Sequence, residues 1–309
     1  MSAPTQASPR AAPASNGGSP ERIAAIDVGS NSVRLSVAEF DPATGLRIID
    51  EIKDQPRLAT GLAGTGHLDP AAIDRAIAAL RRMKEVADRR GVKRLRAVAT
   101  SAVREAANGK NFVKRVKKET GIVLEVIDGD AEASLSYRSV AHHFSLTEGR
   151  ALIADIGGGS LELIGAVNGL IELSDSLPMG AVRLTETWLT GKRSTPKEVT
   201  KLRTWVRKRL KKAVDRRDWA STTVIGSGGT FTNLARMARG RRGFDVGDAV
   251  HGEVITTGEV EQLLDWLSTK TTEDRASVPG LNPERADIIL AGLAVTAELL
   301  ALAGARNVI

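Results

Sequence analysis

Two copies of one glycine-rich turn constrain the fold of this chain more than any other feature. The second copy is Ala151 to Gly165, ALIADIGGGSLELIG, where an apolar stretch leads to Asp155, three consecutive glycines and another apolar stretch. The first copy is Ile23 to Val37, IAAIDVGSNSVRLSV, with Asp27 in the place of Asp155. The same alignment matches Gly29 with Gly157 and Ser32 with Ser160. Two such strand–turn–strand units, about half a chain apart, predict a duplicated fold with a cleft between its halves.

Composition narrows the class of protein. The chain has 309 residues, of which 42% are hydrophobic, and this is enough for two cores of ordinary size. Cysteine is absent, which excludes disulfides and thiolate metal sites and suits a cytoplasmic enzyme. No apolar run approaches the ~20 residues of a membrane helix, so we expect no membrane association. The net charge of +7 favours polyanions as partners: nucleic acid, anionic lipid or phosphate esters.

The order of the elements is the same in both halves. Residues 1–20 are rich in Ala, Pro and Ser, and we expect a disordered tail. The first half is expected to contain three strands, a helix, a strand, a helical region and a strand, near 22–28, 32–40, 45–53, 69–90, 95–100, 101–119 and 122–127. This is the order of a ribonuclease-H-like unit. The second half begins again with strands near 151–155, 159–166 and 169–177. We therefore expect domain I over 21–129, joined by about 299–309, and domain II over 130–298.

A basic helix is expected to begin at Pro196. It has an apolar stripe with lysines and arginines around it, a pattern typical of a solvated helix face. Nucleic-acid binding by this helix is the alternative. An aromatic content of 3% disfavours it, because few side chains could stack on bases.

Six motifs occur in a distinctive order. They are DVGSNSVRL, ATSAVREAAN, GDAEASL, DIGGGSLEL, LPMGAVRL and GSGGT. Together they resemble the exopolyphosphatase/guanosine pentaphosphate phosphohydrolase (Ppx/GppA) family of the actin, sugar kinase and chaperone ATPase superfamily. The resemblance implies an α/β protein with duplicated ribonuclease-H-like (actin-like ATPase) domains facing each other across a cleft. It also implies Mg²⁺-dependent release of the terminal phosphate of polyphosphate, or conversion of guanosine pentaphosphate to tetraphosphate.

Both turns are candidate phosphate sites. Phosphate release develops negative charge on oxygen atoms, and backbone N–H groups directed at that charge stabilise it. Glycine permits this arrangement because no Cβ blocks the ligand. The alternative is a pair of hairpins without a ligand. The candidate residues are Gly29, Ser30, Asn31, Ser32, Gly157, Gly158, Gly159 and Ser160.

Carboxylates near the turns are candidate metal ligands. Mg²⁺ prefers oxygen ligands and needs only one or two carboxylates beside phosphate oxygens. Asp155 and Asp27 end the strands that lead into the turns, and Glu162 shares a strand face with Ser160. The family resemblance supports Asp155 and Glu162 near the metal. From the sequence alone, an exposed strand residue is the simpler interpretation of Glu162.

Glu132 is the candidate general base. It lies in the first turn of an expected helix at the junction of the halves, where an acidic residue also complements the helix dipole. Physical reasoning alone favours the dipole role. The position of Glu132 within GDAEASL matches the catalytic glutamate of the family, and this favours catalysis.

Further candidates have weaker support. Arg34 occupies the position that aligns with Glu162, so a cation in the first half replaces a carboxylate in the second. Ser101 and Arg104 follow an expected strand end, and Arg104 resembles a phosphate ligand of the family. Weak nucleotide or phosphate candidates are Arg183 and the GSGGT glycines Gly226, Gly228 and Gly229.

Two other functions remain open from the sequence. A phosphotransferase of the same superfamily would need an acceptor pocket, and a non-catalytic polyphosphate or nucleotide sensor would need no Glu132. A homodimer is compatible with these observations. In the family, a Ser-x-x-Gly-Leu-Arg-x-Gly-like segment follows the strand expected at Arg306, whereas this sequence ends at Ile309. We expect either a fragment or a fold that closes with a shortened strand.

Overall fold

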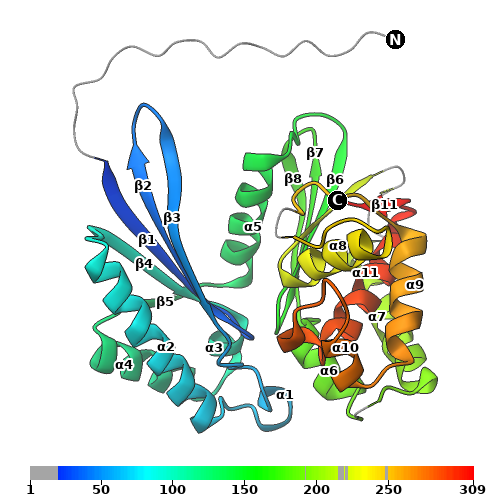
Figure 1. The fold of residues 1–309 in the computed structure, drawn as a ribbon, viewed down its shortest axis with the longest axis horizontal. Helices are drawn as coiled ribbons and strands as arrows, with labels where there is room; N and C mark the ends of the chain where they lie inside the picture. The colour runs from blue at the N-terminus through cyan, green and yellow to red at the C-terminus, as the bar shows by residue number, and fades with distance from the viewer. Residues whose placement is uncertain (1–19, 192, 215–218, 220–221, 248–249) are drawn as a thin grey trace.

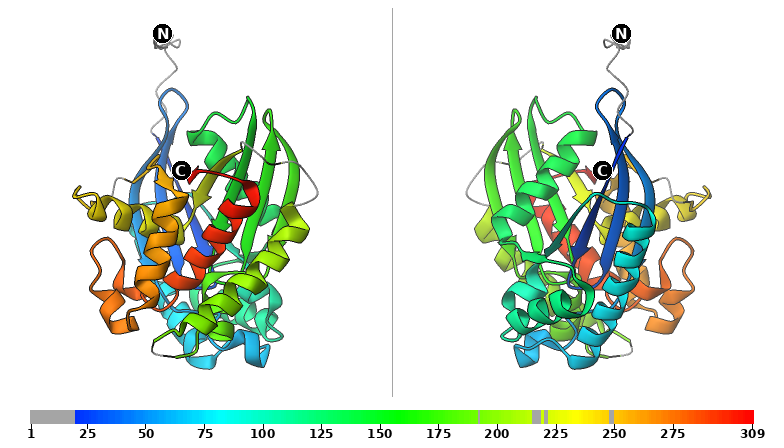
Figure 2. Two further views of the ribbon diagram at one scale, coloured as in Figure 1. Left: turned by 90° about the vertical axis from the view of Figure 1, so that its right-hand side faces the viewer. Right: turned by 90° about the vertical axis from the view of Figure 1, so that its left-hand side faces the viewer.

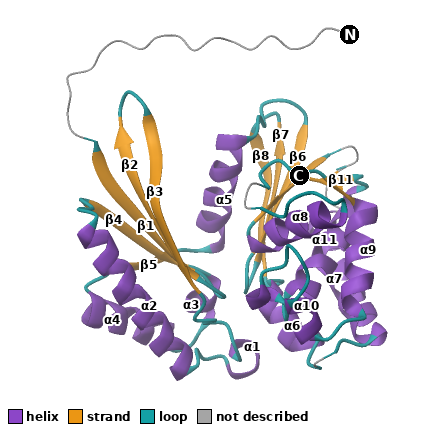
Figure 3. Cartoon of the chain, in the orientation of Figure 1, coloured by secondary structure: helices purple, strands orange, loops and turns teal. Residues whose placement is uncertain are grey.

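The computed structural model describes residues 20–309 except 192, 215–218, 220–221 and 248–249. Two mixed α/β units lie side by side, each with one sheet, and the helices pack against the sheets (Figure 1, Figure 3). The tail expected over 1–20 lies outside the described residues, apart from Pro20. None of the described helices is long and apolar enough to cross a lipid bilayer.

The first unit has the sheet order β3-β2-β1-β4-β5. Strand β2 is antiparallel to β1 and β3, whereas β4 and β5 continue the sheet in parallel. Val33, Leu35 and Val37 alternate along β2 and are all fully buried, because alternate residues of a strand share one face. The elements are β1 (Glu21–Val28), β2 (Val33–Asp41), β3 (Gly45–Asp54), α1 (Leu62–Thr65), α2 (Pro70–Arg89), β4 (Arg94–Ala99), α3 (Ser101–Glu105), α4 (Gly109–Thr120) and β5 (Leu124–Val126).

The second unit repeats this order as β8-β7-β6-β9-β11, with β10 added at the edge. The duplicated ribonuclease-H-like fold predicted from the two turns is therefore confirmed. The elements are α5 (Gly129–His143), β6 (Arg150–Ile156), β7 (Leu161–Val167), β8 (Leu170–Leu177), α6 (Ala181–Trp188), α7 (Pro196–Val214), β9 (Thr223–Ser227), α8 (Gly229–Arg241), β10 (Ile255–Thr256), α9 (Thr257–Ser268), α10 (Thr272–Ala276), the 3₁₀ helix η1 (Pro283–Arg285), α11 (Ile289–Ala303) and β11 (Asn307–Val308).

The end of the chain corrects one expectation. Residues 299–309 were expected to join the first half, but β11 pairs with β9 and β10 in the second sheet. Helix α11 is apolar on all sides and almost completely buried among the helices of the second unit (Figure 2). A helix of this kind needs a core all around it, and the second unit supplies one.

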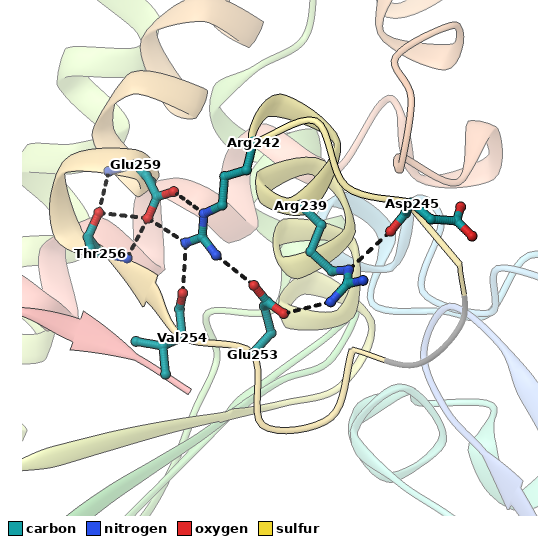
Figure 4. Close-up of polar contacts among 7 residues, drawn as sticks. All are labelled: Arg239, Arg242, Asp245, Glu253, Val254, Thr256 and Glu259. Atoms are coloured by element: carbon teal, nitrogen blue, oxygen red, sulfur yellow. Dashed lines mark hydrogen bonds and ion pairs between the residues drawn. The ribbon is translucent and has the colours of Figure 1, made fainter.

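A network of charged groups fastens the end of α8 to the start of α9 (Figure 4). Arg242 donates to both oxygens of Glu259 at 2.7 and 2.8 Å and to Glu253 at 2.6 Å. Arg239 reaches the other oxygen of Glu253 at 3.1 Å. Glu259 also closes a capping box with Thr256, in which each side chain accepts the other residue's backbone N–H.

Removal of this cap should destabilise the protein. Thr256→Ala leaves the N–H of Glu259 without its acceptor, so we expect the free energy of unfolding to fall by about 1 kcal/mol. Urea unfolding followed by circular dichroism measures this loss. Thr204→Ala is the matched control, because Thr204 is an exposed threonine inside α7 that donates only to the carbonyl of Thr200. Equal losses for the two variants would contradict a specific capping role.

The same network predicts a dependence on pH. The hydrogen bond from Arg242 lowers the pKa of Glu259 from 4.5 to about 2. Since the pKa is lower in the folded state, the stabilisation is present above about pH 4.5 and is lost as pH falls towards 2. Wild type and Glu259→Gln should therefore differ in stability at pH 6 and converge in acid. A difference that persists unchanged at about pH 2 would rule out ionisation of Glu259 as its cause.

Candidate active site

A cleft of about 410 Å³ lies between the two units, and both glycine-rich turns line it. Four carboxylates face this cleft: Asp27, Glu132, Asp155 and Glu162. Three cations complete the lining: Arg34, Lys53 and Arg285. The cleft thus combines backbone N–H groups, carboxylates and positively charged side chains, although these residues lie far apart in the sequence.

The two turns are built in the same way. Gly29 N–H donates to the Ser32 carbonyl at 3.0 Å, and Gly157 N–H donates to the Ser160 carbonyl at 3.0 Å. These two N–H groups close the turns, so they are not free for phosphate as the sequence analysis expected. Within the described part of the chain, the N–H groups of four neighbouring residues donate to no other group, and these are Ser30, Asn31, Gly158 and Gly159. Free N–H groups from both halves are therefore available to bind an anion.

The glycines of the second turn allow the two turns to touch. A Cβ on Gly159 would lie 2.5 Å from Ser101 Oγ and 2.6 Å from Ser30 Oγ. A Cβ on Gly158 would lie 3.0 Å from the backbone N of Asn31. The Asn31 side chain is only 4% exposed, and neither of its polar atoms has a partner within the described residues. A buried amide of this kind is costly unless a ligand or water satisfies it.

The strand pairs next to the turns differ between the halves. Asp27 lies opposite Arg34 across β1 and β2, which pairs a carboxylate with a cation. Asp155 lies opposite Glu162 across β6 and β7, which places two carboxylates together. Glu162 is only 2% exposed, so it is not the exposed strand residue that the sequence alone suggested. Within the described residues no Lys, Arg or His pairs with Glu162, whose neighbours include the donor Ser176 at 2.9 Å.

Burial raises the pKa of the carboxyl groups around this pair. Burial, together with the charge of Glu132, raises the pKa of Glu162 to about 8. Burial also raises the pKa of Asp155, against the opposing hydrogen bonds from Ser136 and Ser227. Burial and the negative charge of Asp155 raise the pKa of Asp27 to about 6, although the positive charge of Arg34 opposes this rise. A cation among these groups would stabilise their ionised forms.

These residues fit a magnesium ion. Among the described residues, no three His, Cys, Asp or Glu side chains already converge as a preformed metal site. Mg²⁺ does not require one, because it commonly binds one or two carboxylates and takes its other oxygens from phosphate and water. Asp155 and Glu162 would supply the carboxylates for such an ion, and they line the same cleft as the free N–H groups of the turns.

Glu132 lies at the start of α5, and one of its two carboxylate oxygens accepts a hydrogen bond. Arg104 donates to Glu132 Oε2 at 3.0 Å and to the Ile127 carbonyl at 2.8 Å. The other oxygen, Oε1, accepts no hydrogen bond from a described residue. Burial raises the pKa of Glu132, while Arg104 opposes the rise. Glu132, which lines the cleft, therefore has a carboxylate that is anchored through one oxygen and leaves the other without a donor among the described residues.

Several predicted site residues lie elsewhere. Arg104 borders a second opening beside the cleft and binds Glu132 instead of projecting into the cleft. Ser101, a candidate phosphate-binding residue, lies against Gly159 and donates to Glu105. Arg183 donates to the Gly159 carbonyl at 2.9 Å and pairs with Glu105, so it supports the turn from outside. Gly226 is packed against the ring of Phe231, whereas Gly228 and Gly229 do line the cleft.

Two cations of the cleft were missed in the sequence. Lys53 is the penultimate residue of β3, and Arg285 is the last residue of η1. Burial and the nearby charges of Arg285 and Arg34 lower the pKa of Lys53. No motif surrounds either residue, and no sequence signal could have found them, because η1 lies more than two hundred residues from β3. Mutually repelling cations of this kind are stabilised when an anion lies between them.

Comparison with known proteins shows the family to which the chain belongs. The model of the Ppx/GppA phosphatase family matches residues 36–308. Exopolyphosphatase 1 of Mycobacterium leprae is 34% identical over 283 residues, which cover 89% of this chain and 81% of the relative. The chain belongs to the Ppx/GppA phosphatase family.

Solved structures share the fold. The Ppx/GppA family member of Aquifex aeolicus has a TM-score of 0.76 at 33% identity, covering 94% of this chain and 92% of that chain. An exopolyphosphatase of Cytophaga hutchinsonii has a TM-score of 0.85 at 26% identity, covering 93% of each chain. The similarity thus extends over both units.

Proposed function

We propose that this protein is a Mg²⁺-dependent phosphoanhydride hydrolase. It releases the terminal phosphate of inorganic polyphosphate, converts guanosine pentaphosphate to tetraphosphate, or does both. The observation that carries the proposal is the pair of facing turns with free N–H groups beside a buried pair of carboxylates. The similarity to exopolyphosphatases supports a substrate with phosphoanhydride bonds.

The residues divide the reaction between them. The free N–H groups of the two turns hold the oxygens of the terminal phosphate and stabilise the charge that develops on them. Glu132 Oε1 accepts a proton from a water molecule as the water oxygen bonds to phosphorus. The bond from phosphorus to the bridging oxygen breaks, and the shortened chain leaves with the electron pair. The raised pKa of Glu132 makes its carboxylate a stronger base than an exposed one.

Asp155 and Glu162 would hold the metal. When bound there, Mg²⁺ supplies positive charge to phosphate oxygens that the two carboxylates would otherwise repel. Ser136 donates to Asp155 at 2.9 Å and Ser176 to Glu162 at 2.9 Å, so both carboxylates are kept in place. The cations at the cleft, Arg34, Lys53 and Arg285, provide a place for the rest of a polyanionic substrate.

One assay tests the proposal. Phosphate release is measured from medium-length polyphosphate and from guanosine pentaphosphate, each with Mg²⁺ and with excess chelator. We expect release from at least one substrate, and we expect the chelator to abolish it. Absence of release from both substrates would contradict the hydrolase, and undiminished release in chelator would contradict the metal. Phosphate transfer to an added alcohol instead of water would favour the phosphotransferase.

A further inference from the structure

The segment after β3 connects the first phosphate turn with the second unit. Arg57 N–H donates to the Asn31 carbonyl at 3.1 Å, and Ala59 N–H donates to the Ser30 carbonyl at 2.8 Å. These bonds engage the carbonyl groups of two turn residues whose own N–H groups are free. The segment thereby fixes the orientation of the first turn.

The side chain of Arg57 crosses to the other unit. It donates to Asp287 Oδ2 at 2.5 Å and Oδ1 at 3.2 Å, and to the Glu284 carbonyl at 2.7 Å. The fork of the guanidinium group suits this two-point contact, which a lysine could not reproduce. Glu284 and Asp287 lie on either side of Arg285 in the chain. Arg57 therefore holds both flanks of a cation that lines the cleft.

The backbone conformation of Arg57 is unusual. Its φ is +57°, and among the described residues only Asn168 shares a positive φ without being glycine. A left-handed conformation costs a residue with a Cβ about 1 kcal/mol or more, and it persists where the surroundings determine it. Here the surroundings are the first turn on one side and η1 on the other.

The side chain of Arg285 has no hydrogen bond of its own, within the described part of the chain, to keep it in place. It is 9% exposed, its Nε has no partner, and its side chain makes no hydrogen bond to a described residue. It lies against Gly229, where a Cβ would come within 2.0 Å of its Nη2. We infer that this guanidinium group is directed to the cleft by packing against Gly229 and by the hydrogen bonds of Arg57 to Glu284 and Asp287.

We propose that Arg57 is a positioning residue that sets Arg285 relative to the first phosphate turn. The proposal rests on the proposed function only in taking the ligand to be a chain of phosphates. Arg57 acts through Arg285, because it bonds to the residues around Arg285 and does not itself line the cleft.

Arg57 could position Arg285, or it could only hold the two units together, and other contacts between the units make these two roles distinguishable. Gly61 N–H donates to Glu186 at 2.9 Å, and Arg183 pairs with Glu105. Neither contact flanks a cation of the cleft. If Arg57 only held the units together, its loss would add to the loss of Arg285 instead of being absorbed by it.

The experiment is a double-mutant cycle with tripolyphosphate as the probe. Its dissociation constant is measured by calorimetry for wild type, Arg57→Ala, Arg285→Ala and the double variant. We expect each single variant to weaken binding about tenfold, as for the loss of one charge-assisted hydrogen bond, and the double variant to be no weaker than Arg285→Ala. Asp287→Asn keeps the side-chain shape and should reproduce Arg57→Ala within about twofold.

The control is Arg75→Ala. Arg75 holds the same segment from α2, donating to the Pro56 carbonyl at 3.0 Å, and it makes no hydrogen bond or ion pair with the described residues of η1. It should bind tripolyphosphate as wild type does. Additive losses in the double variant, or unchanged binding in Arg57→Ala and Asp287→Asn, would overturn the proposal. Because binding is measured in excess chelator, in which we expect no turnover, failure of the hydrolase proposal would appear only in the phosphate-release assay.

Discussion

Glu132→Gln should lower turnover by roughly 10²–10⁴-fold, equivalent to about 3–5 kcal/mol of barrier, while folding and substrate binding are kept. The amide cannot accept the proton of the attacking water, although it has the size of the carboxylate and can still accept the hydrogen bond of Arg104. Turnover is measured as phosphate release at saturating substrate, and binding by calorimetry with tripolyphosphate.

The matched control for this prediction is Asp130→Asn. Asp130 lies in the same first turn of α5, so both side chains complement the helix dipole, but Asp130 does not line the cleft. The control should keep wild-type turnover. If Glu132→Gln retains more than about a third of wild-type turnover, or if both variants lose equally, Glu132 has no part in proton transfer.

Arg34→Ala and Glu162→Gln should separate the roles of the two halves. Asp27 faces a cation, whereas Asp155 faces a second carboxylate, so we infer that the first half binds phosphate directly and the second through the metal. Glu162→Gln should raise the Mg²⁺ concentration for half-maximal rate by a coupling of about 1–3 kcal/mol, or roughly 5–150-fold. Arg34→Ala should raise KM with little change in the Mg²⁺ requirement.

The measurement is a titration of Mg²⁺ at several substrate concentrations for wild type and both variants. Ser176→Ala is a useful third variant, because it removes a donor to Glu162 while leaving the charge in place. It should shift the Mg²⁺ requirement less than Glu162→Gln does. An unchanged Mg²⁺ curve for Glu162→Gln would end the metal assignment, and a shift of equal size for Arg34→Ala would end the division between the halves.

The local elements and their duplication could be predicted from the sequence. The alternation of Val33, Leu35 and Val37 reports the buried face of β2, and the repeated Asp-x-Gly pattern reports two strand–turn–strand units. The helix expected near 69–90 is α2, which Asp69 caps and which has Pro70 as its first residue. These features depend on neighbours within a few residues, so the local sequence contains the necessary information.

The local sequence also nominated most residues of the cleft, because the turns carry them. Asp27, Asp155 and Glu162 lie within a few residues of a glycine-rich turn, and the structure places all three on its walls. Whether Glu162 is buried or exposed could not be read from a strand pattern. Burial depends on what covers the strand face, and here α5 packs against β7.

Only the tertiary structure decided which distant groups meet. Arg285 and Lys53 share the cleft, and Arg57 reaches Asp287, because the two units pack together and not because of any pattern in the chain. Packing likewise placed residues 299–309 in the second unit, since a helix as apolar as α11 is stable only where it is covered on all sides. Sequence periodicity specifies which face of an element is buried, whereas the partner of that face is set by the free energy of packing over the whole fold.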